Sequence, residues 1–302
     1  MSPGGLAAAL LLAAALPGAA AGDAVVRQVG RLTIRVDTRH ARPGGLFAVS
    51  FVSRDRLGAL SAIFEGRRAP AFDGPRGRES LVPIPLGTPP GSGTLGVELG
   101  TRRGVQRFKL EVPVGDRAYP RRRHALSPAV SALVSSAAAR RDGRRLLLAL
   151  REMSPRSLRK GPFRPPVAVV PSDSFGSHEE RDGLPVERTS DGAWGERQRT
   201  LEYPMLPGSA VGAPAGGTVV LAERLTLTGG TLVIDHGEGL VSALYPLEAV
   251  ALGTGDSVAA GERVGVSGLD PLGEAPRLEW GLYLHGIAVD ARLVIALESP
   301  SP

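Results

Sequence analysis

The sequence predicts a mainly β protein in which a short helical connector joins two β domains. Short β-branched and aliphatic runs alternate with glycine-rich turns along most of the 302 residues. The 40 Gly, 26 Pro and 4% aromatic residues favour many short strands over long helices. An Ala- and Leu-rich run near the N-terminus and a basic, Ala- and Leu-rich stretch in the middle of the chain depart from this pattern. We therefore divide the chain into residues 1–22, 24–115, 116–163 and 164–298.

Residues 1–22 are predicted to be a secretory signal peptide. The run Leu6–Leu16 contains only Ala and Leu, which is too short to span a bilayer comfortably. Pro17-Gly18 ends it, and Ala19-Ala-Ala21 offers small residues for cleavage. We expect a secreted or periplasmic protein with no stable membrane span after cleavage; an uncleaved anchor is the alternative. The chain has no Cys, so it has neither a lipoprotein anchor nor disulfides.

The net charge of +6 comes almost entirely from arginine. A GC-rich genome explains this usage most simply; the alternative is attraction to an anionic polymer such as a cell wall or to a membrane surface. The sequence shows neither a basic segment with interspersed aromatic residues nor a nucleic-acid recognition motif, so a nucleic-acid partner is not expected.

Residues 24–115 are predicted to form an immunoglobulin-like β-sandwich. Alternating apolar and polar residues, as in Leu32–Val36, indicate strands with one buried face. Short strands at roughly ten-residue spacing are typical of such sandwiches. We expect this domain to act as a spacer or folding partner rather than as a specific ligand-binding module. The predicted strands are Leu32–Val36, Leu46–Val52, Ala59–Glu65, Ser80–Ile84, Thr94–Leu99 and Gln106–Val112.

Residues 116–163 are predicted to be a basic helical connector. Ser127 and Pro128 suit the N-cap and first helical positions. Two helices are expected, Ala129–Arg140 and Arg144–Met153, separated at Asp142-Gly143. The second has a Leu-rich side that could bind a membrane surface or a partner. The preferred interpretation is a connector helix whose Leu side packs on one domain.

The last domain is expected to begin with a strand at Val167–Val170, followed by a long charged loop over Ser177–Arg199. Its core runs from Gly208 to Val289 and resembles the LytM or lysostaphin-type zinc endopeptidases, which cut peptidoglycan cross-bridges. That resemblance implies a C-terminal LytM-like antiparallel β-core with a peptide-binding groove. It is carried by Ser174-Phe-Gly-Ser177, Gly208-Ser-Ala-Val211, Asp235-His-Gly-Glu-Gly239, Gly255-Asp256 and Trp280-Gly281.

The resemblance also implies five site positions, and all five are changed. Counting without gaps, the three zinc-ligand positions of active relatives fall on Gln198, Glu202 and Glu279. The two catalytic histidine positions fall on Pro246 and Arg277. Proline has no proton to exchange, and a permanently charged guanidinium is neither a base nor a metal ligand. We therefore predict no catalytic residue, no metal ligand and no zinc cofactor.

The expected groove then becomes a recognition surface, and the leading functional hypothesis is a non-catalytic LytM-like protein. Degenerate relatives imply a role in cell-wall remodelling, by binding and activating a wall hydrolase such as an amidase or by binding peptidoglycan. One alternative is an active zinc endopeptidase with atypical ligands, for instance His178 with Glu202 and Glu279. Another is an envelope scaffold or adhesion module. The candidate binding residues are Gln198, Glu202, Tyr245, Arg277, Glu279 and Trp280.

Convergence of the three ligand positions predicts one further feature. Two carboxylates at a common centre would repel each other. The Arg277 fork is suited to pair with Glu202, Glu279 or both, so we expect these ion pairs in the structure. The remaining histidine of interest, His236, is expected to support a turn rather than a metal.

Overall fold

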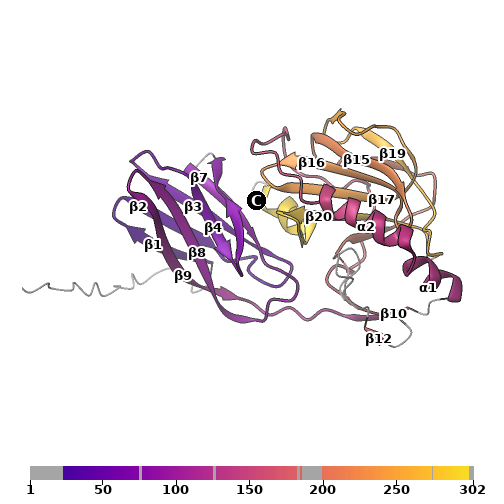
Figure 1. Ribbon diagram of the computed structural model, residues 1–302, viewed down its shortest axis with the longest axis horizontal. Coiled ribbons are helices and arrows are strands. Elements are labelled where there is room, and N and C mark those ends of the chain that lie inside the picture. Colours follow the sequence, from indigo (N-terminus) through magenta and orange to yellow (C-terminus); the bar gives the residue numbers. More distant parts are fainter. Residues whose placement is uncertain are drawn as a thin grey trace, which may run out of the picture.

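A computed structural model describes residues 23–74, 77–124, 127–181, 184–185, 199–273 and 275–298. The protein consists of two β domains side by side (Figure 1). The mainly β class predicted from the sequence is confirmed. In the described residues, no helix is both long and apolar enough to cross a membrane.

The N-terminal domain is a sandwich of two antiparallel sheets with the aliphatic core between them. All six predicted strands are present, and β1, β5 and β6 are additional. The immunoglobulin-like assignment of this sandwich remains a prediction. The first sheet runs in the order β1 (Ala24–Val29), β2 (Leu32–Asp37), β3 (Leu46–Ser53), β7 (Gly77–Pro83) and β6 (Phe72–Gly74). The second runs β5 (Arg67–Pro70), β4 (Leu60–Phe64), β8 (Gly91–Thr101) and β9 (Gly104–Val114).

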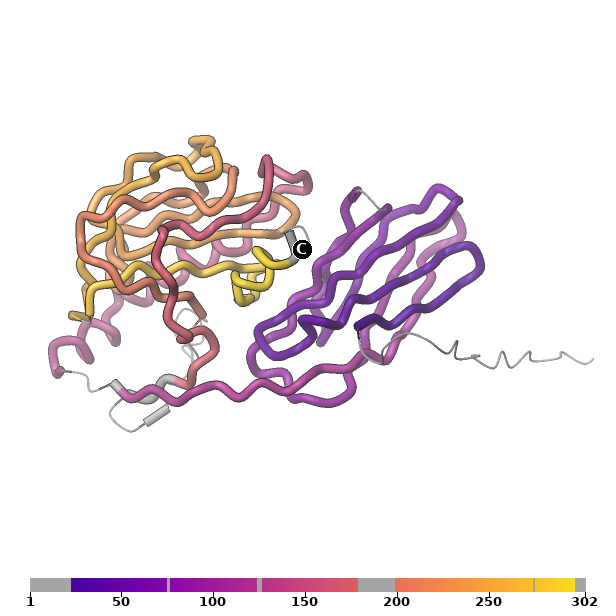
Figure 2. The backbone as a smooth tube through the Cα atoms, turned by 180° about the vertical axis from the view of Figure 1, so that it is seen from behind, coloured from indigo at the N-terminus to yellow at the C-terminus, as the bar shows by residue number. Residues whose placement is uncertain are grey.

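The C-terminal domain is built on a nine-stranded sheet. Helix α3 (Ala291–Glu298) follows its last strand and lies on the side that faces the sandwich (Figures 1 and 2). The main order is β13 (Leu201–Pro204), β20 (Arg277–Leu284), β17 (Leu240–Val250), β16 (Gly229–Gly237), β15 (Gly217–Leu225) and β18 (Ser257–Val258). The remaining strands are β14 (Ala210–Gly212), β19 (Arg263–Ser267) and β21 (Ile287–Val289).

The connector contains two helices, but they break at a different place from the one predicted. Helix α1 spans Pro128–Val134 and α2 spans Ala137–Ala149. Ser135 is the C-cap of the first helix, and Ser136 is the N-cap of the second, where its hydroxyl accepts from the Ala139 N–H at 3.0 Å. Gly143 lies inside α2, where the contacts of the helix offset its weak helix propensity.

Helix α2 belongs to the core of the C-terminal domain. Its Leu146 and Ala149 join that core together with Leu150, while Leu148 is exposed. This agrees with the preferred interpretation of a Leu side packed on one domain. The predicted strand at Val167–Val170 is wrong: this segment has no ladder partner, although the Val167 side chain is buried in the core.

A small sheet connects the beginning of the connector with the first part of the last domain. Strand β10 (Arg121–His124) pairs in parallel with β11 (His178–Arg181), which pairs with β12 (Leu184–Pro185). Figure 2 shows the chain leaving the sandwich as an extended segment before it reaches this sheet. The predicted loop Ser177–Arg199 thus contains two short strands, and residues 186–198 lie outside the described part of the chain.

The two domains contact each other through polar and apolar groups. Leu46 of β3 belongs to the core of the C-terminal domain. The Asp290 N–H donates to the Gly44 carbonyl at 2.9 Å, and Arg117 donates to the Asp290 carboxylate at 3.0 Å. Burial opposes ionisation of Asp290, but Arg292 and Arg117 outweigh it and lower its pKa.

Asp142 fixes α2 to the hairpin between β15 and β16, which gives a first prediction. Its buried carboxylate accepts from the Thr226 N–H at 3.0 Å and from the Thr226 hydroxyl at 2.6 Å. Asp142→Ala leaves both donors without this acceptor, and we expect the free energy of unfolding to fall by about 2 kcal/mol. Urea denaturation measures it, with the exposed Arg224→Ala as control. Equal midpoints for the two variants would contradict this role.

Candidate functional site

Three neighbouring strands bring the predicted site residues together. In the register of β13 and β20, Glu202 lies directly opposite Glu279. In the register of β17 and β20, Tyr245 lies opposite the same Glu279. Residues directly opposite each other share a face of the sheet, and Arg277 shares it because it precedes Glu279 by two residues. Four of the six candidate binding residues therefore occupy one face.

The Arg277 guanidinium lies among three carboxylates. It is 3.5 Å from Glu202, 3.0 Å from Glu279 and 2.9 Å from Asp270. Only 12% of the Arg277 side chain is exposed, so water screens these pairs weakly. The ion pairs expected from the sequence are present. Asp270, in the segment between β19 and β20, is a third partner that sequence reasoning did not include.

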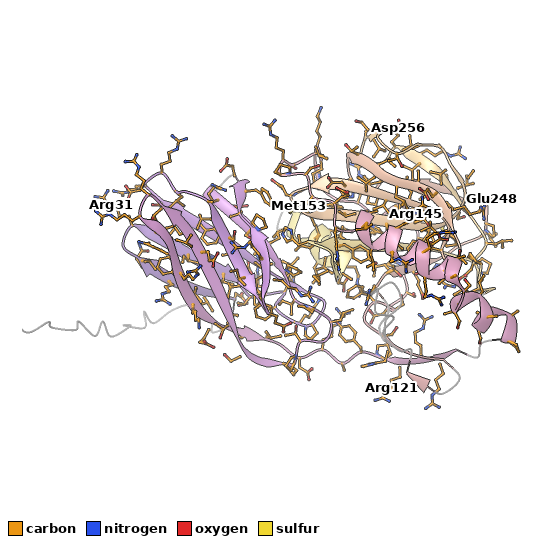
Figure 3. The ribbon with its side chains drawn as sticks, in the orientation of Figure 1. Arg31, Arg121, Arg145, Met153, Glu248 and Asp256 are labelled. Carbon is orange, nitrogen blue, oxygen red and sulfur yellow. The ribbon has the colours of Figure 1, made fainter. Side chains whose placement is uncertain are left out.

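A second arginine, from the connector, binds one of these carboxylates. Arg122 of β10 donates to both oxygens of Glu202, at 3.0 and 2.9 Å. Its neighbour Arg121, labelled in Figure 3, shows where β10 lies beside the C-terminal domain. Glu202 is thereby held by one arginine from its own domain and one from about 80 residues earlier in the chain. The basic run Arg121-Arg-Arg123 was visible in the sequence, but nothing in it indicated this contact.

Two hydroxyl groups also form hydrogen bonds with the carboxylates of Glu202 and Glu279. The Thr200 hydroxyl donates to Glu279 Oε2 at 2.6 Å, and the Ser172 hydroxyl lies 3.4 Å from Glu202 Oε2. Burial raises the pKa of Glu279, although Arg277 and Thr200 favour its ionised form. Burial also raises the pKa of Tyr245, and the charge of Glu279 adds to this effect.

The described residues of the site do not fit zinc, which the family resemblance implies. A zinc centre takes about four N, O or S ligands around one point. Here the carboxylate oxygens of Glu202 and Glu279 already accept bonds from arginine and threonine, and a permanent cation lies between them. Among the residues described, no group of three His, Cys, Asp or Glu could hold a metal ion. Gln198 lies outside the described residues.

The other predicted site residues, Pro246, Trp280 and His178, lie in the core or in the small sheet. Pro246 is buried and follows Tyr245 through a cis peptide bond. The prediction that Trp280 belongs to the binding surface is wrong, because its side chain is fully buried. His178 begins β11, next to β10. Among the described residues, His178 forms no metal site with Glu202 and Glu279.

Trp280 instead belongs to a buried polar chain beneath this face. Its indole N–H can only donate, and it donates to the Ser242 hydroxyl at 3.0 Å. A carbonyl can only accept, so His236 Nδ1–H donates to the Gly216 carbonyl at 2.8 Å. In the neutral ring that burial favours, Nε2 accepts from the Ser242 hydroxyl at 2.8 Å. Burial lowers the pKa of His236 to about 4. As expected, His236 has a structural environment.

Comparison with known proteins agrees with this architecture. Residues 196–291 match the model of peptidase family M23. An uncharacterized protein of Neisseria meningitidis serogroup B is 32% identical over 125 residues, which is 39% of this chain. The chain spans about a fifth of that relative's length, since the match covers 20% of it.

A crystal structure of a candidate M23 peptidase from Pseudomonas aeruginosa shares the fold. Its TM-score is 0.62 at 21% identity, and the match covers 85% of this chain and 95% of that one. The likeness therefore extends over most of the chain and not only over the β-core. Residues 196–291 are therefore a peptidase family M23 domain.

Proposed function

We propose that this protein is a non-catalytic M23 protein of the cell envelope that acts in cell-wall remodelling. The observation that carries the proposal is the position of Arg277, paired with Glu202, Glu279 and Asp270 where the resemblance to LytM-type enzymes implies a metal. A guanidinium can hold two strands together as a metal ion does, but it supplies neither a Lewis acid nor a bound water. The face that carries Glu202, Tyr245, Arg277 and Glu279 would then serve to bind a partner rather than to catalyse a reaction.

The partner we propose is a wall hydrolase, such as a peptidoglycan amidase, or peptidoglycan itself. Arg122 and Tyr245 are the partly exposed members of the face, with 35% of the Arg122 side chain exposed. Arginine suits the carboxylates of a peptide, and tyrosine suits its apolar stems. Secretion through the predicted signal peptide would place the protein in the compartment where such partners act.

The purified chain should contain no stoichiometric zinc and should not lyse purified cell walls. The reason is that Pro246 and Arg277 occupy the two positions where the family resemblance implies catalytic histidines. Elemental analysis and a wall-turbidity assay measure these properties, with an active enzyme of the family as positive control. About one zinc per chain together with chelator-sensitive lysis would show that the proposal is wrong.

A restored variant tests whether the counted positions correspond to the metal site. We expect Gln198→His, Glu202→Asp, Arg277→His and Glu279→His, combined, to gain zinc binding that the parent chain lacks. The matched control changes Arg277 alone to His.

Partner binding is tested by co-sedimentation with wall sacculi and by amidase stimulation, with Arg122→Ala as the surface variant. If neither partner binds, the scaffold alternative is favoured.

A further inference from the structure

Five arginines from three loops gather at one end of the N-terminal sandwich. We call this group the arginine tip. The β1–β2 turn carries Arg31, which Figure 3 shows at the outer end of the sandwich, away from the C-terminal domain. The segment after β3 contributes two arginines and the β8–β9 hairpin contributes two more. The arginine tip consists of Arg31, Arg54, Arg56, Arg102 and Arg103.

Strand pairing fixes these three loops next to one another. Leu32 pairs with Ser53, so the β1–β2 turn adjoins the segment that begins at Arg54. The Gly100 N–H donates to the Ala59 carbonyl at 2.7 Å, which joins the other end of that segment to the β8–β9 hairpin. A Cβ on Gly58 would lie 2.2 Å from the Gly100 oxygen, so only glycine permits this approach.

The arginine tip carries a concentrated positive charge. All five side chains belong to exposed residues, and the acidic group described among them is Asp55, 3.2 Å from Arg31. The excess of basic residues in the whole chain also lies in the N-terminal domain. Residues 23–115 contain 15 Arg and Lys against 8 Asp and Glu, whereas the remainder contains 21 against 22. The positive potential of the protein therefore originates in the sandwich.

Apolar side chains are exposed beside these arginines. Val52, one residue from the end of β3, is 48% exposed, and Val105, at the start of β9, is 52% exposed. Within the pairing of β8 and β9, Val105 lies opposite Gly100, next to the two hairpin arginines. A soluble polyanion offers contacts for arginine but none for valine. A lipid surface offers both, because apolar side chains can enter the boundary between headgroups and acyl chains.

We infer that the arginine tip docks the protein on an anionic lipid bilayer. Lipid phosphates match the planar guanidinium fork, and the two valines add apolar contact at the same surface. This surface is remote from Arg277 and Arg122, and the inference does not depend on the function proposed for that site. Docking by the sandwich would leave the C-terminal domain projecting from the membrane toward its own partner.

The test is co-sedimentation of the chain, from residue 23 onward, with vesicles. That start is used for every variant because the Leu6–Leu16 run would itself enter lipid. Vesicles containing phosphatidylglycerol should bind the protein, vesicles of phosphatidylcholine alone should not, and salt should weaken the binding. The tip variant combines Arg54→Gln, Arg56→Gln, Arg102→Gln and Arg103→Gln. The matched control, with the same change in charge, combines Arg140→Gln, Arg144→Gln, Arg156→Gln and Arg224→Gln.

We expect the tip variant to bind anionic vesicles at least roughly 25-fold more weakly, the loss of two fully effective basic contacts, and the control to change little. Circular dichroism should show both folded; Arg102→Gln with Arg103→Gln on the exposed hairpin serves if the fourfold variant is not. Val105→Ser should weaken vesicle binding but not binding to polyphosphate. No binding to anionic vesicles, equal loss in the control, or no response to Val105→Ser would overturn the inference.

Discussion

Arg277→Ala is expected to lower the free energy of unfolding by about 3 kcal/mol. Breaking a buried ion pair costs roughly 3–5 kcal/mol because the remaining charge is left uncompensated. The lower value applies here because Arg122 continues to neutralise Glu202. Glu279 and Asp270 each lose their ion pair with Arg277, and Glu279 lies directly opposite Glu202 on the neighbouring strand.

Urea denaturation at neutral pH measures this loss, with Arg224→Ala as the matched control. Arg224 is exposed and makes a long 3.4 Å bond to a carbonyl, so its removal should cost less than about 0.5 kcal/mol. The deficit of Arg277→Ala should shrink in mild acid, because Glu279, whose pKa burial already raises, can then take up a proton. Equal losses in the two variants would mean that Arg277 does not hold the carboxylates together.

Calcium offers an independent check on the same site. Without the guanidinium, the carboxylates of Glu202, Glu279 and Asp270 would repel one another, and calcium, which suits carboxylate oxygens better than zinc does, would draw them together into a site that the parent chain lacks. Added calcium should therefore raise the melting temperature of Arg277→Ala and leave that of the parent chain unchanged. A response of both proteins would point to calcium binding elsewhere.

The strands of this protein could be predicted from the sequence because their pattern is local. Alternation in Leu32–Val36 and the glycine turns of the C-terminal core fix which segments are extended. The break between α1 and α2 was misplaced because Asp142-Gly143 has the composition of a turn. Its true role is set by tertiary contacts: Asp142 accepts from Thr226, about 84 residues away. Local signals cannot encode such a partner.

The candidate site was partly predictable for a related reason. Counting along the family resemblance placed Glu202, Arg277 and Glu279 together, and the register of β13 and β20 brings them within contact. Arg122 was missed because it comes from the connector and meets Glu202 only after both segments fold. Trp280 was grouped with the surface residues, but it follows Glu279 directly and so lies on the opposite face of the strand, where its N–H is used inside the core.

Stability should fall steeply in acid because of His236. Burial holds its folded-state pKa at about 4, against 6.5 for the free side chain. Above pH 6.5 both the folded and unfolded states carry the neutral ring, so the full stability is present. As the pH falls from 6.5 to about 4, the unfolded chain binds a proton that the folded chain does not, which favours unfolding. The loss attributable to His236 reaches about 3 kcal/mol at the lower end of this window.

Urea denaturation across this pH window, with His236→Gln as the comparison, isolates the effect because the carboxylates are common to both chains. We expect the variant to be less stable at neutral pH, since glutamine cannot reproduce both ring bonds, but to lose about 3 kcal/mol less on acidification. His285, whose pKa burial also lowers to about 4, should add a slope of the same sign, and His285→Gln should reduce it separately. Parallel pH profiles for the parent and His236→Gln would show that His236 titrates normally in the folded protein, and the neutral ring between Ser242 and Gly216 would then be the wrong assignment.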